Sequence, residues 1–256
     1  MTKVSLGVIL CRIERGRPEV LLVHKRYSYA FAEFVHGRYV RRSDAPAGLR
    51  PVADLLDRMT TEELLDVWSL NFDQMWYRVW LSHEKREMYA AKLTKFRLTH
   101  LGDGGQALRR MVQRARSRSQ LLWEVPKGRR NGPREADVVC AARELHEETG
   151  IAKSEYRLIP GARRRVSYVS AGTQYVCQYY VGVASPHAAG APAARGLGCS
   201  TLREIGLMGE VSEARWHSIE QLRMLDADTR HLEALVGPAF ALVKRFLKGD
   251  IKNIIV

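Results

Sequence analysis

Nine residues, Arg143-Glu144-Leu145-His146-Glu147-Glu148-Thr149-Gly150-Ile151, say more about the architecture of this 256-residue chain than any other segment. The segment is predicted to be helical, and residues three and four positions apart on a helix are neighbours. Glu144, Glu147 and Glu148 are therefore expected to converge, although their like charges repel one another. A cation that takes oxygen ligands relieves the repulsion, and Mg²⁺ and Mn²⁺ are such cations. The segment predicts a metal platform for phosphate chemistry.

The wider string from Gly128 through Glu135 to Ile151 resembles the Nudix box, which is a glycine, a spaced glutamate and then Arg-Glu-apolar-x-Glu-Glu-x-Gly-apolar. In one departure, six residues separate Gly128 from Glu135, where the family usually has five. The extra residue falls at Asn131-Gly132-Pro133, which is turn chemistry, so the helix is expected to be intact. A bare Glu-Glu pair is usually a solvated helix face, but here the rest of the box surrounds it.

Bulk composition adds a charge argument. The formal net charge of +13 favours a polyanionic partner, either nucleic acid, a membrane surface or a highly phosphorylated small molecule, with simple solubility as the plain alternative. No apolar stretch approaches the length of a membrane span, so we expect no membrane contact. The cysteines at 11, 140, 177 and 199 form no Cys-x-x-Cys spacing. They predict a reducing, cytoplasmic compartment.

Strand and helix patterns alternate unevenly along the chain. Short apolar, β-branched runs predict strands, and a capping box from Thr60 to Glu63 marks a block of helical patterns. Asn71 or Asp73 is expected to cap the next helix. The predicted strands are 3–12, 18–25, 121–125, 156–159, 164–169, 174–184 and 210–216. The predicted helices lie within 52–118, in the box, at 218–225 and at 228–248, the last divided by Gly237-Pro238.

The Nudix resemblance implies an α+β fold, an α/β/α sandwich with a mixed sheet. The helical block then reads as an inserted all-helical domain. We expect residues 1–35 and 119–256 to form the catalytic domain and residues 36–118 to form a basic, RNA-binding insert. Residues 185–200, rich in glycine, proline and alanine, predict a flexible loop.

Three further segments resemble a narrower group, the mRNA-decapping Nudix hydrolases of large DNA viruses. They are residues 25–34, residues 72–77 in the insert, and Leu122-Trp123-Glu124-Val125-Pro126-Lys127-Gly128. The likeness covers most of the chain and weakens after about residue 185. It implies cleavage of the cap triphosphate bridge of capped RNA, which gives 7-methylguanosine diphosphate and 5′-monophosphate RNA.

The resemblance also implies a role for each box residue. Glu144, Glu147 and Glu148 are the expected catalytic metal ligands, and the carbonyl of Gly128 is a candidate further ligand. The remaining assignments are Arg143 as an orienting partner for a carboxylate, Glu135 as its salt-bridge mate, Gly150 as a structural box residue, and Lys127 as a phosphate contact. For the general base, Glu210 lies six residues before Trp216, a spacing similar to that of decapping enzymes, and Glu213 is the competing candidate.

Basic residues gather in two places. Ten basic and two acidic residues lie between 85 and 118, a local charge of +8 that suggests a face tracking a phosphate backbone. The candidate RNA contacts are Lys92, Lys95, Arg109, Arg110, Arg114 and Arg116, with Arg129, Arg130 and the 163–165 cluster nearer the box. Aromatic residues of the insert suit either base stacking or its core, and their spacing favours the core.

Three functions remain open at this point. The first is the decapping hydrolase, dependent on Mg²⁺ or Mn²⁺. The second is a small-molecule phosphohydrolase acting on diphosphoinositol polyphosphates or nucleoside triphosphates. The third is an RNA-binding module with a decayed box, which the three intact glutamates disfavour. The insert favours the first over the second, because a small substrate needs no second domain.

Overall fold

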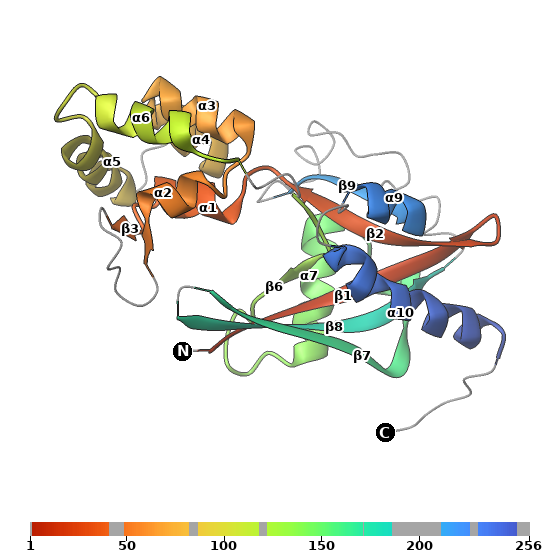
Figure 1. Cartoon of the computed structure of the whole chain (residues 1–256). Coiled ribbons are helices and arrows are strands. Elements are labelled where there is room, and N and C mark those ends of the chain that lie inside the picture. The colour runs from red at the N-terminus through yellow and green to blue at the C-terminus, as the bar shows by residue number, and fades with distance from the viewer. Residues whose placement is uncertain are drawn as a thin grey trace. The chain divides into compact units, whose positions relative to one another are not determined.

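The computed structural model describes residues 2–40, 49–81, 87–117, 122–170, 172–185, 211–225 and 230–249. They form two compact units, which are described separately (Figure 1). One unit joins the segments Met1–Lys25 and Trp123–Val256, and the other is Arg26–Leu122. These boundaries differ from the expected insert of 36–118, because the second unit begins at Arg26. In the described part of the chain, no helix is long and apolar enough to cross a membrane.

The first unit is built on a mixed sheet. Strands β1 (Thr2–Glu14) and β2 (Arg17–Lys25) form an antiparallel hairpin closed by Arg15 and Gly16, both at positive φ, as tight hairpins require. The sheet continues with β8 (Thr173–Ala184) parallel to β1, and with β7 (Tyr156–Ser170) antiparallel to β8. The remaining strands are β5 (Trp123–Glu124) and β9 (Val211–Ser218), both antiparallel to β2, and β6 (Lys127–Gly128), antiparallel to β1.

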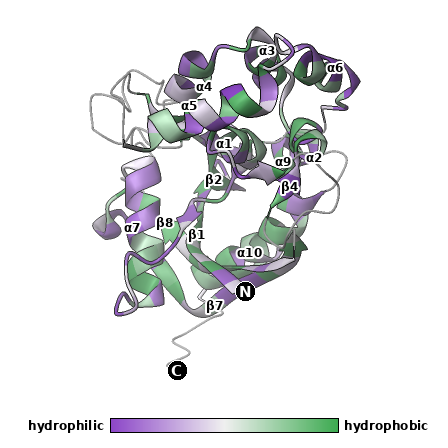
Figure 2. Ribbon diagram, turned by 90° about the vertical axis from the view of Figure 1, so that its left-hand side faces the viewer, coloured by the Kyte–Doolittle hydropathy of each residue, from purple (hydrophilic) through white to green (hydrophobic). Residues whose placement is uncertain are grey.

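Helices cover both faces of this sheet (Figures 1 and 2). Alternate residues of β1 point to opposite faces. Leu6, Val8 and Leu10 pack in one core cluster with the box helix α7 (Asp137–Thr149). Ile9 and Cys11 point to the other face, where α10 (His231–Leu247) packs with α9 (Ile219–Leu225) beside it. The expected α/β/α sandwich is confirmed, with a short 3₁₀ helix, Lys153–Glu155, leading into β7.

Two expectations about this unit are wrong in detail. The tail is not divided at Gly237-Pro238, because α10 runs through both residues. Its buried side chains, Val236 and Phe240 among them, hold the helix on the sheet although Pro238 lacks an N–H. The strands expected at 156–159 and 164–169 form one strand, β7, whose pairing with β8 shifts register between Leu158 and Arg163. Expectations for residues 186–210 lie outside the described residues.

The second unit is mainly helical. Its helices are α1 (Tyr29–Val35), α2 (Val52–Leu56), α3 (Thr61–Ser69), α4 (Phe72–Trp80), α5 (Glu87–His100) and α6 (Gln106–Arg114). The capping box is confirmed, since Glu63 N donates to Thr60 Oγ1 at 3.2 Å and Thr60 N donates to Glu63 Oε2 at 2.9 Å. Asn71, not Asp73, caps α4.

This unit departs from an all-helical domain in one respect, because β3 (Tyr39–Val40) and β4 (Arg50–Pro51) form a short parallel pair. Helix α1 was not expected, yet its buried Phe31 and Phe34 belong to the core of the unit. Two of the aromatic residues, Phe72 and Trp76, are buried in that core as expected, whereas Trp68 is 36% exposed.

Candidate active site

The box begins where β6 pairs with β1 and ends where α7 stops. Gly128 is the last residue of β6, and α7 begins at Asp137 after the connecting loop. Gly150 ends the helix at φ 75°, a left-handed conformation that glycine adopts without a steric penalty. Its N–H donates to the carbonyl of His146 at 2.8 Å. The expected structural role of Gly150 is therefore visible in the geometry.

Arg143 organises the loop and the helix together. Its Nε donates to Glu135 Oε1 at 2.8 Å and its Nη2 to the carbonyl of Arg129 at 2.9 Å. Its Nη1 lies 2.9 Å from both Glu144 Oε1 and Glu147 Oε2. The hydrogen bond from Arg143 holds the pKa of Glu135 below its usual range. The predicted ion pair between Arg143 and Glu135 is confirmed.

Glu144 lies directly against the backbone of Gly128. A β-carbon at position 128 would collide with the carboxylate of Glu144. Glycine therefore lets this carboxylate lie against the main chain, and a larger residue would displace the end of the Glu144 side chain. Burial, together with nearby Glu147 and Glu135, raises the pKa of Glu144 against the opposing effect of Arg143.

Glu148 points away from Arg143. Its Oε2 accepts a hydrogen bond from the main-chain nitrogen of Lys127 at 3.1 Å. Burial raises the pKa of Glu148 to about 8, and Lys25 is the largest opposing influence. A carboxyl group whose charge is disfavoured by burial is well suited to a cation, which compensates that charge when it binds.

A buried charge cluster adjoins Glu148 and was not recognised in the sequence. Lys25 is 5% exposed, and its ammonium lies 3.2 Å from Glu124 Oε1. The other oxygen of Glu124 pairs with the ammonium of Lys127. Burial opposes the ionisation of Glu124, yet Lys127 and Lys25 together hold its pKa below the usual range. The only sequence signal was that Lys25 and Glu124 occur in segments shared with the decapping enzymes.

The donors suit an oxygen-preferring cation, but they do not yet converge on one point. Within the described ranges, no three His, Cys, Asp or Glu side chains are grouped so as to hold a metal ion. The expected meeting of Glu144, Glu147 and Glu148 is therefore not seen, because the first two carboxylates pair with Arg143 while the third binds Lys127 N. Glu144 and Glu148 with the Gly128 carbonyl remain a hard oxygen set of the kind that Mg²⁺ and Mn²⁺ prefer.

The other candidate site residues differ in their surroundings. Arg130 forms an ion pair with Asp137, whereas Arg129 has an exposed side chain. The ammonium of Lys127 is held by Glu124, which competes with its expected role as a phosphate contact. Glu210, the candidate base, lies outside the described residues. Its competitor Glu213 lies on β9 and pairs with Arg215.

The candidate RNA contacts of the second unit are spread over α5 and α6. Lys95 donates to the carbonyl of Gly37, and Arg109 lies over the exposed ring of Trp68 at 5.7 Å. Arg110 is 3.8 Å from Asp103, an exposed pair, and Arg114 is exposed at the end of α6. Arg116 does not share that helix as expected, because α6 ends at Arg114.

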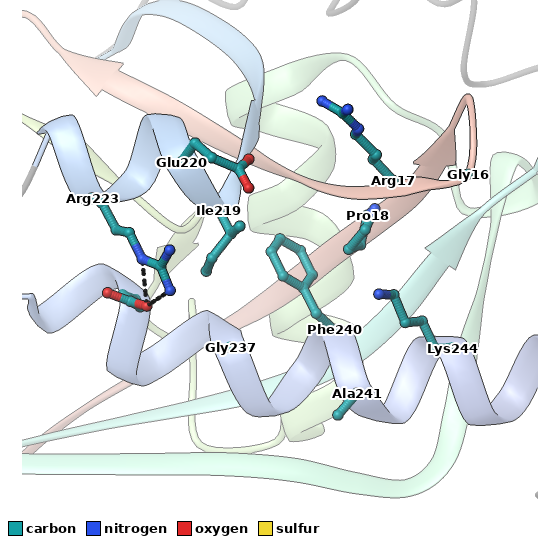
Figure 3. Close-up of a pocket in the computed structure, with 11 residues that line it drawn as sticks. Gly16, Arg17, Pro18, Ile219, Glu220, Arg223, Gly237, Phe240, Ala241 and Lys244 are labelled. Atoms are coloured by element: carbon teal, nitrogen blue, oxygen red, sulfur yellow. Dashed lines mark hydrogen bonds and ion pairs between the residues drawn. The ribbon is translucent and has the colours of Figure 1, made fainter.

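A hollow of about 760 Å³ lies elsewhere on the first unit, between the β1–β2 turn and helices α9 and α10 (Figure 3). Phe240 lines it, as do Arg17, Lys244 and the ion pair of Arg223 with Glu233 at 2.7 Å. None of the box residues lines this hollow, so it is separate from the candidate active site.

The Nudix resemblance predicts this arrangement: the glutamate-bearing helix α7 packs on a mixed sheet, Gly128 lies against Glu144, and Glu135 pairs with Arg143. The NUDIX domain family matches residues 101–236, and the chain belongs to the Nudix family of hydrolases, as predicted. It is 32% identical over 259 residues to the mRNA-decapping protein g5R of African swine fever virus, an alignment that covers 96% of this chain and 98% of that protein.

Two further similarities are shorter or weaker. A 37-residue segment is 51% identical to a putative mRNA-decapping protein of Acanthamoeba polyphaga mimivirus, covering 14% of this chain and 10% of that one. Among solved structures, the C. elegans Ap4A hydrolase covers 95% of this chain and 99% of its own, with 14% identity and a TM-score of 0.43. That score is too low to carry weight in the assignment.

Proposed function

We propose that this protein is a viral-type mRNA-decapping hydrolase. The observation that carries the proposal is full-length similarity to g5R, together with a Nudix box in which Arg143 pairs with Glu135 and Gly128 lies against Glu144. The reaction adds water across the cap triphosphate bridge. One P–O bond forms to the water oxygen and one bridging P–O bond breaks. The products are 7-methylguanosine diphosphate and 5′-monophosphate RNA.

Nudix hydrolases generally use divalent cations such as Mg²⁺ or Mn²⁺, and here we propose Glu144, Glu147, Glu148 and the Gly128 carbonyl as the groups that hold them. Bound cations offset phosphate charge and activate water. Glu144 and Glu147 each pair with Arg143 through one carboxylate oxygen, so each is proposed to reach a cation through its other oxygen or after that pair opens. Glu210 is proposed as the base that takes the water proton, on its spacing from Trp216.

The second unit is proposed to bind the RNA chain through its phosphates. The basic side chains of α6 support this, since Arg110 and Arg114 are exposed and four residues apart on one helix. Backbone contacts of this kind hold any sequence and weaken with salt. Single-stranded capped RNA is the partner that combines a phosphate chain with the triphosphate bridge.

The alternative is a small-molecule activity on diphosphoinositol polyphosphates or nucleoside triphosphates. The box residues are proposed to act on phosphates whatever group carries them, and a densely charged anion suits a basic surface. The test compares the hydrolysis rates of five substrates under the same Mg²⁺ and Mn²⁺ conditions. They are cap-labelled RNA, RNA with an unmethylated cap, uncapped RNA, a diphosphoinositol polyphosphate and GTP. Release of labelled 7-methylguanosine diphosphate at the highest kcat/KM supports decapping. Faster turnover of a small substrate, with capped RNA uncleaved, overturns it.

A further inference from the structure

The charge cluster of Lys25, Glu124 and Lys127 occupies a fixed place in the sheet. Glu124 lies on β5 directly opposite Val23 of β2, and Lys25 ends β2. Val125, between β5 and β6, is 1% exposed. The backbone that carries these charged groups is thus held by strand pairing and by the core.

Both oxygens of Glu124 are engaged by ammonium groups, one from Lys25 and one from Lys127. The carboxylate stays ionised because the two cations outweigh its burial. The contacts of Glu124 therefore fix the side chain of Lys127.

The main chain beside Lys127 touches two of the box glutamates. Lys127 N donates to Glu148 Oε2, and the α-carbon of Gly128 abuts the carboxylate of Glu144. Any displacement of β6 therefore moves the hydrogen-bond donor of Glu148 and the wall against which Glu144 rests. The cluster and the box carboxylates share this one dipeptide.

We infer that Glu124 and Lys25 are positioning residues of the active site, which fix the Lys127–Gly128 dipeptide and through it the carboxylates of Glu144 and Glu148. The inference rests on the proposed role of those two carboxylates as metal ligands. Lys25 acts on Glu124, Glu124 acts on Lys127, and neither touches the reacting atoms. Removing a residue that orients a metal ligand typically lowers metal affinity or activity by about 10- to 100-fold. We expect an effect of roughly this size here.

The test measures Mn²⁺ affinity by electron paramagnetic resonance without substrate, and kcat and KM with substrate. Glu124→Gln is expected to weaken Mn²⁺ binding and lower kcat by about 10- to 100-fold, with KM little changed. Lys25→Met gives the sharper result, because the loss of charge and the loss of positioning change Mn²⁺ affinity in opposite directions. Removing a cation near the site strengthens Mn²⁺ binding by Coulomb's law, whereas loss of positioning weakens it.

Lys244→Met is the matched control, because Lys244 is an exposed lysine on α10, among the residues that line the separate hollow. It should change neither Mn²⁺ affinity nor kcat. Stronger Mn²⁺ binding in Lys25→Met, or unchanged binding in Glu124→Gln, overturns the inference.

Single substitutions here leave a buried charge without a partner and can unfold the protein. The double variant Lys25→Met/Glu124→Gln keeps the net charge of the cluster unchanged, although Lys127 loses its ion pair with Glu124, and circular dichroism checks that the variant is folded. A positioning role predicts a folded double variant with weak Mn²⁺ binding, whereas a purely structural cluster predicts normal binding and turnover, which overturns the inference. If the wild type binds Mn²⁺ and hydrolyses a small phosphate substrate but not capped RNA, decapping fails while this inference is still judged by the metal affinities.

Discussion

The main-chain nitrogen of Lys127 and Oε2 of Glu148 lie 3.1 Å apart, although 21 positions separate the two residues in the sequence. The hydrogen bond joins β6 to the last turn of α7. It places a donor on a buried carboxyl group, whose pKa burial raises to about 8. A strand and a helix thereby form one site.

Glu148→Gln is expected to lower kcat by at least about 1,000-fold while leaving the fold and RNA affinity largely unchanged. A neutral amide is a poorer ligand than a carboxylate, and metal stabilisation of the transition state is worth several kcal/mol. Steady-state cleavage, circular dichroism and RNA binding are measured together. Near-normal turnover in a folded variant contradicts the metal assignment.

The same substitution should stabilise the metal-free protein at alkaline pH. The folded pKa of Glu148, about 8, lies above the ordinary value of 4.5, so the folded state holds a proton that the unfolded state releases. Wild-type stability therefore falls as pH rises from about 4.5 to 8, and the Glu148→Gln substitution removes this decrease, which is on the order of 4 kcal/mol. Urea unfolding in a chelator at pH 5 and pH 8 checks it. A variant no more stable than wild type at pH 8 disproves the shift.

Gly128→Ala should reduce turnover by about 10- to 100-fold, because a β-carbon there displaces the Glu144 carboxylate from its place. Gly132→Ala is the control within the same loop, since a β-carbon at that position meets nothing within 4 Å. Both variants are compared by kcat and by Mn²⁺ affinity. Equal effects of the two substitutions would show that loop flexibility, and not the contact with Glu144, is what matters.

Charge reversal of Arg110 and Arg114 to Glu should weaken RNA binding and flatten its salt dependence. Each phosphate of a single strand that is no longer neutralised lowers the log–log slope by about 0.7. Arg109 and Arg116 should contribute less, because the first lies over Trp68 and the second lies beyond α6. RNA affinity is measured at several salt concentrations. Arg15→Glu, at a side chain 93% exposed in the other unit, is the control, and a slope unchanged from wild type refutes the RNA-binding role.

Glu210→Gln should lower turnover without an equal loss of Mn²⁺ affinity, because a base that accepts the water proton acts on the reaction and not on metal binding. Glu213→Gln should have little effect on turnover, since Glu213 pairs with Arg215 on β9. The two variants are compared by kcat, with Mn²⁺ titrations alongside. If they exchange behaviour, the base is Glu213.

Much of the site followed from local rules. The box helix and the Thr60–Glu63 capping box were predicted because helix periodicity and caps depend on residues a few positions apart, whereas the Glu135–Arg143 pair was implied by the Nudix resemblance. Helix α1 was not predicted, because it is short and its aromatic residues are explained only by their packing in the core of the second unit. The unbroken α10 likewise depends on packing that outweighs the helix-breaking tendency of Gly237-Pro238.

The sequence by itself therefore determined the carboxylates of the box helix, because helix periodicity acts between residues that are close along the chain. Its resemblance to the Nudix family implied the mixed sheet between helices, although the strands of that sheet pair over long separations. Tertiary structure alone decided that Lys25 and Glu124 lie beside Glu148, and that Glu144 and Glu147 share Arg143 rather than meeting Glu148. The physical reason is that strand register and burial bring distant charges together. Once they are buried, each charge takes the partner that best offsets its lost hydration.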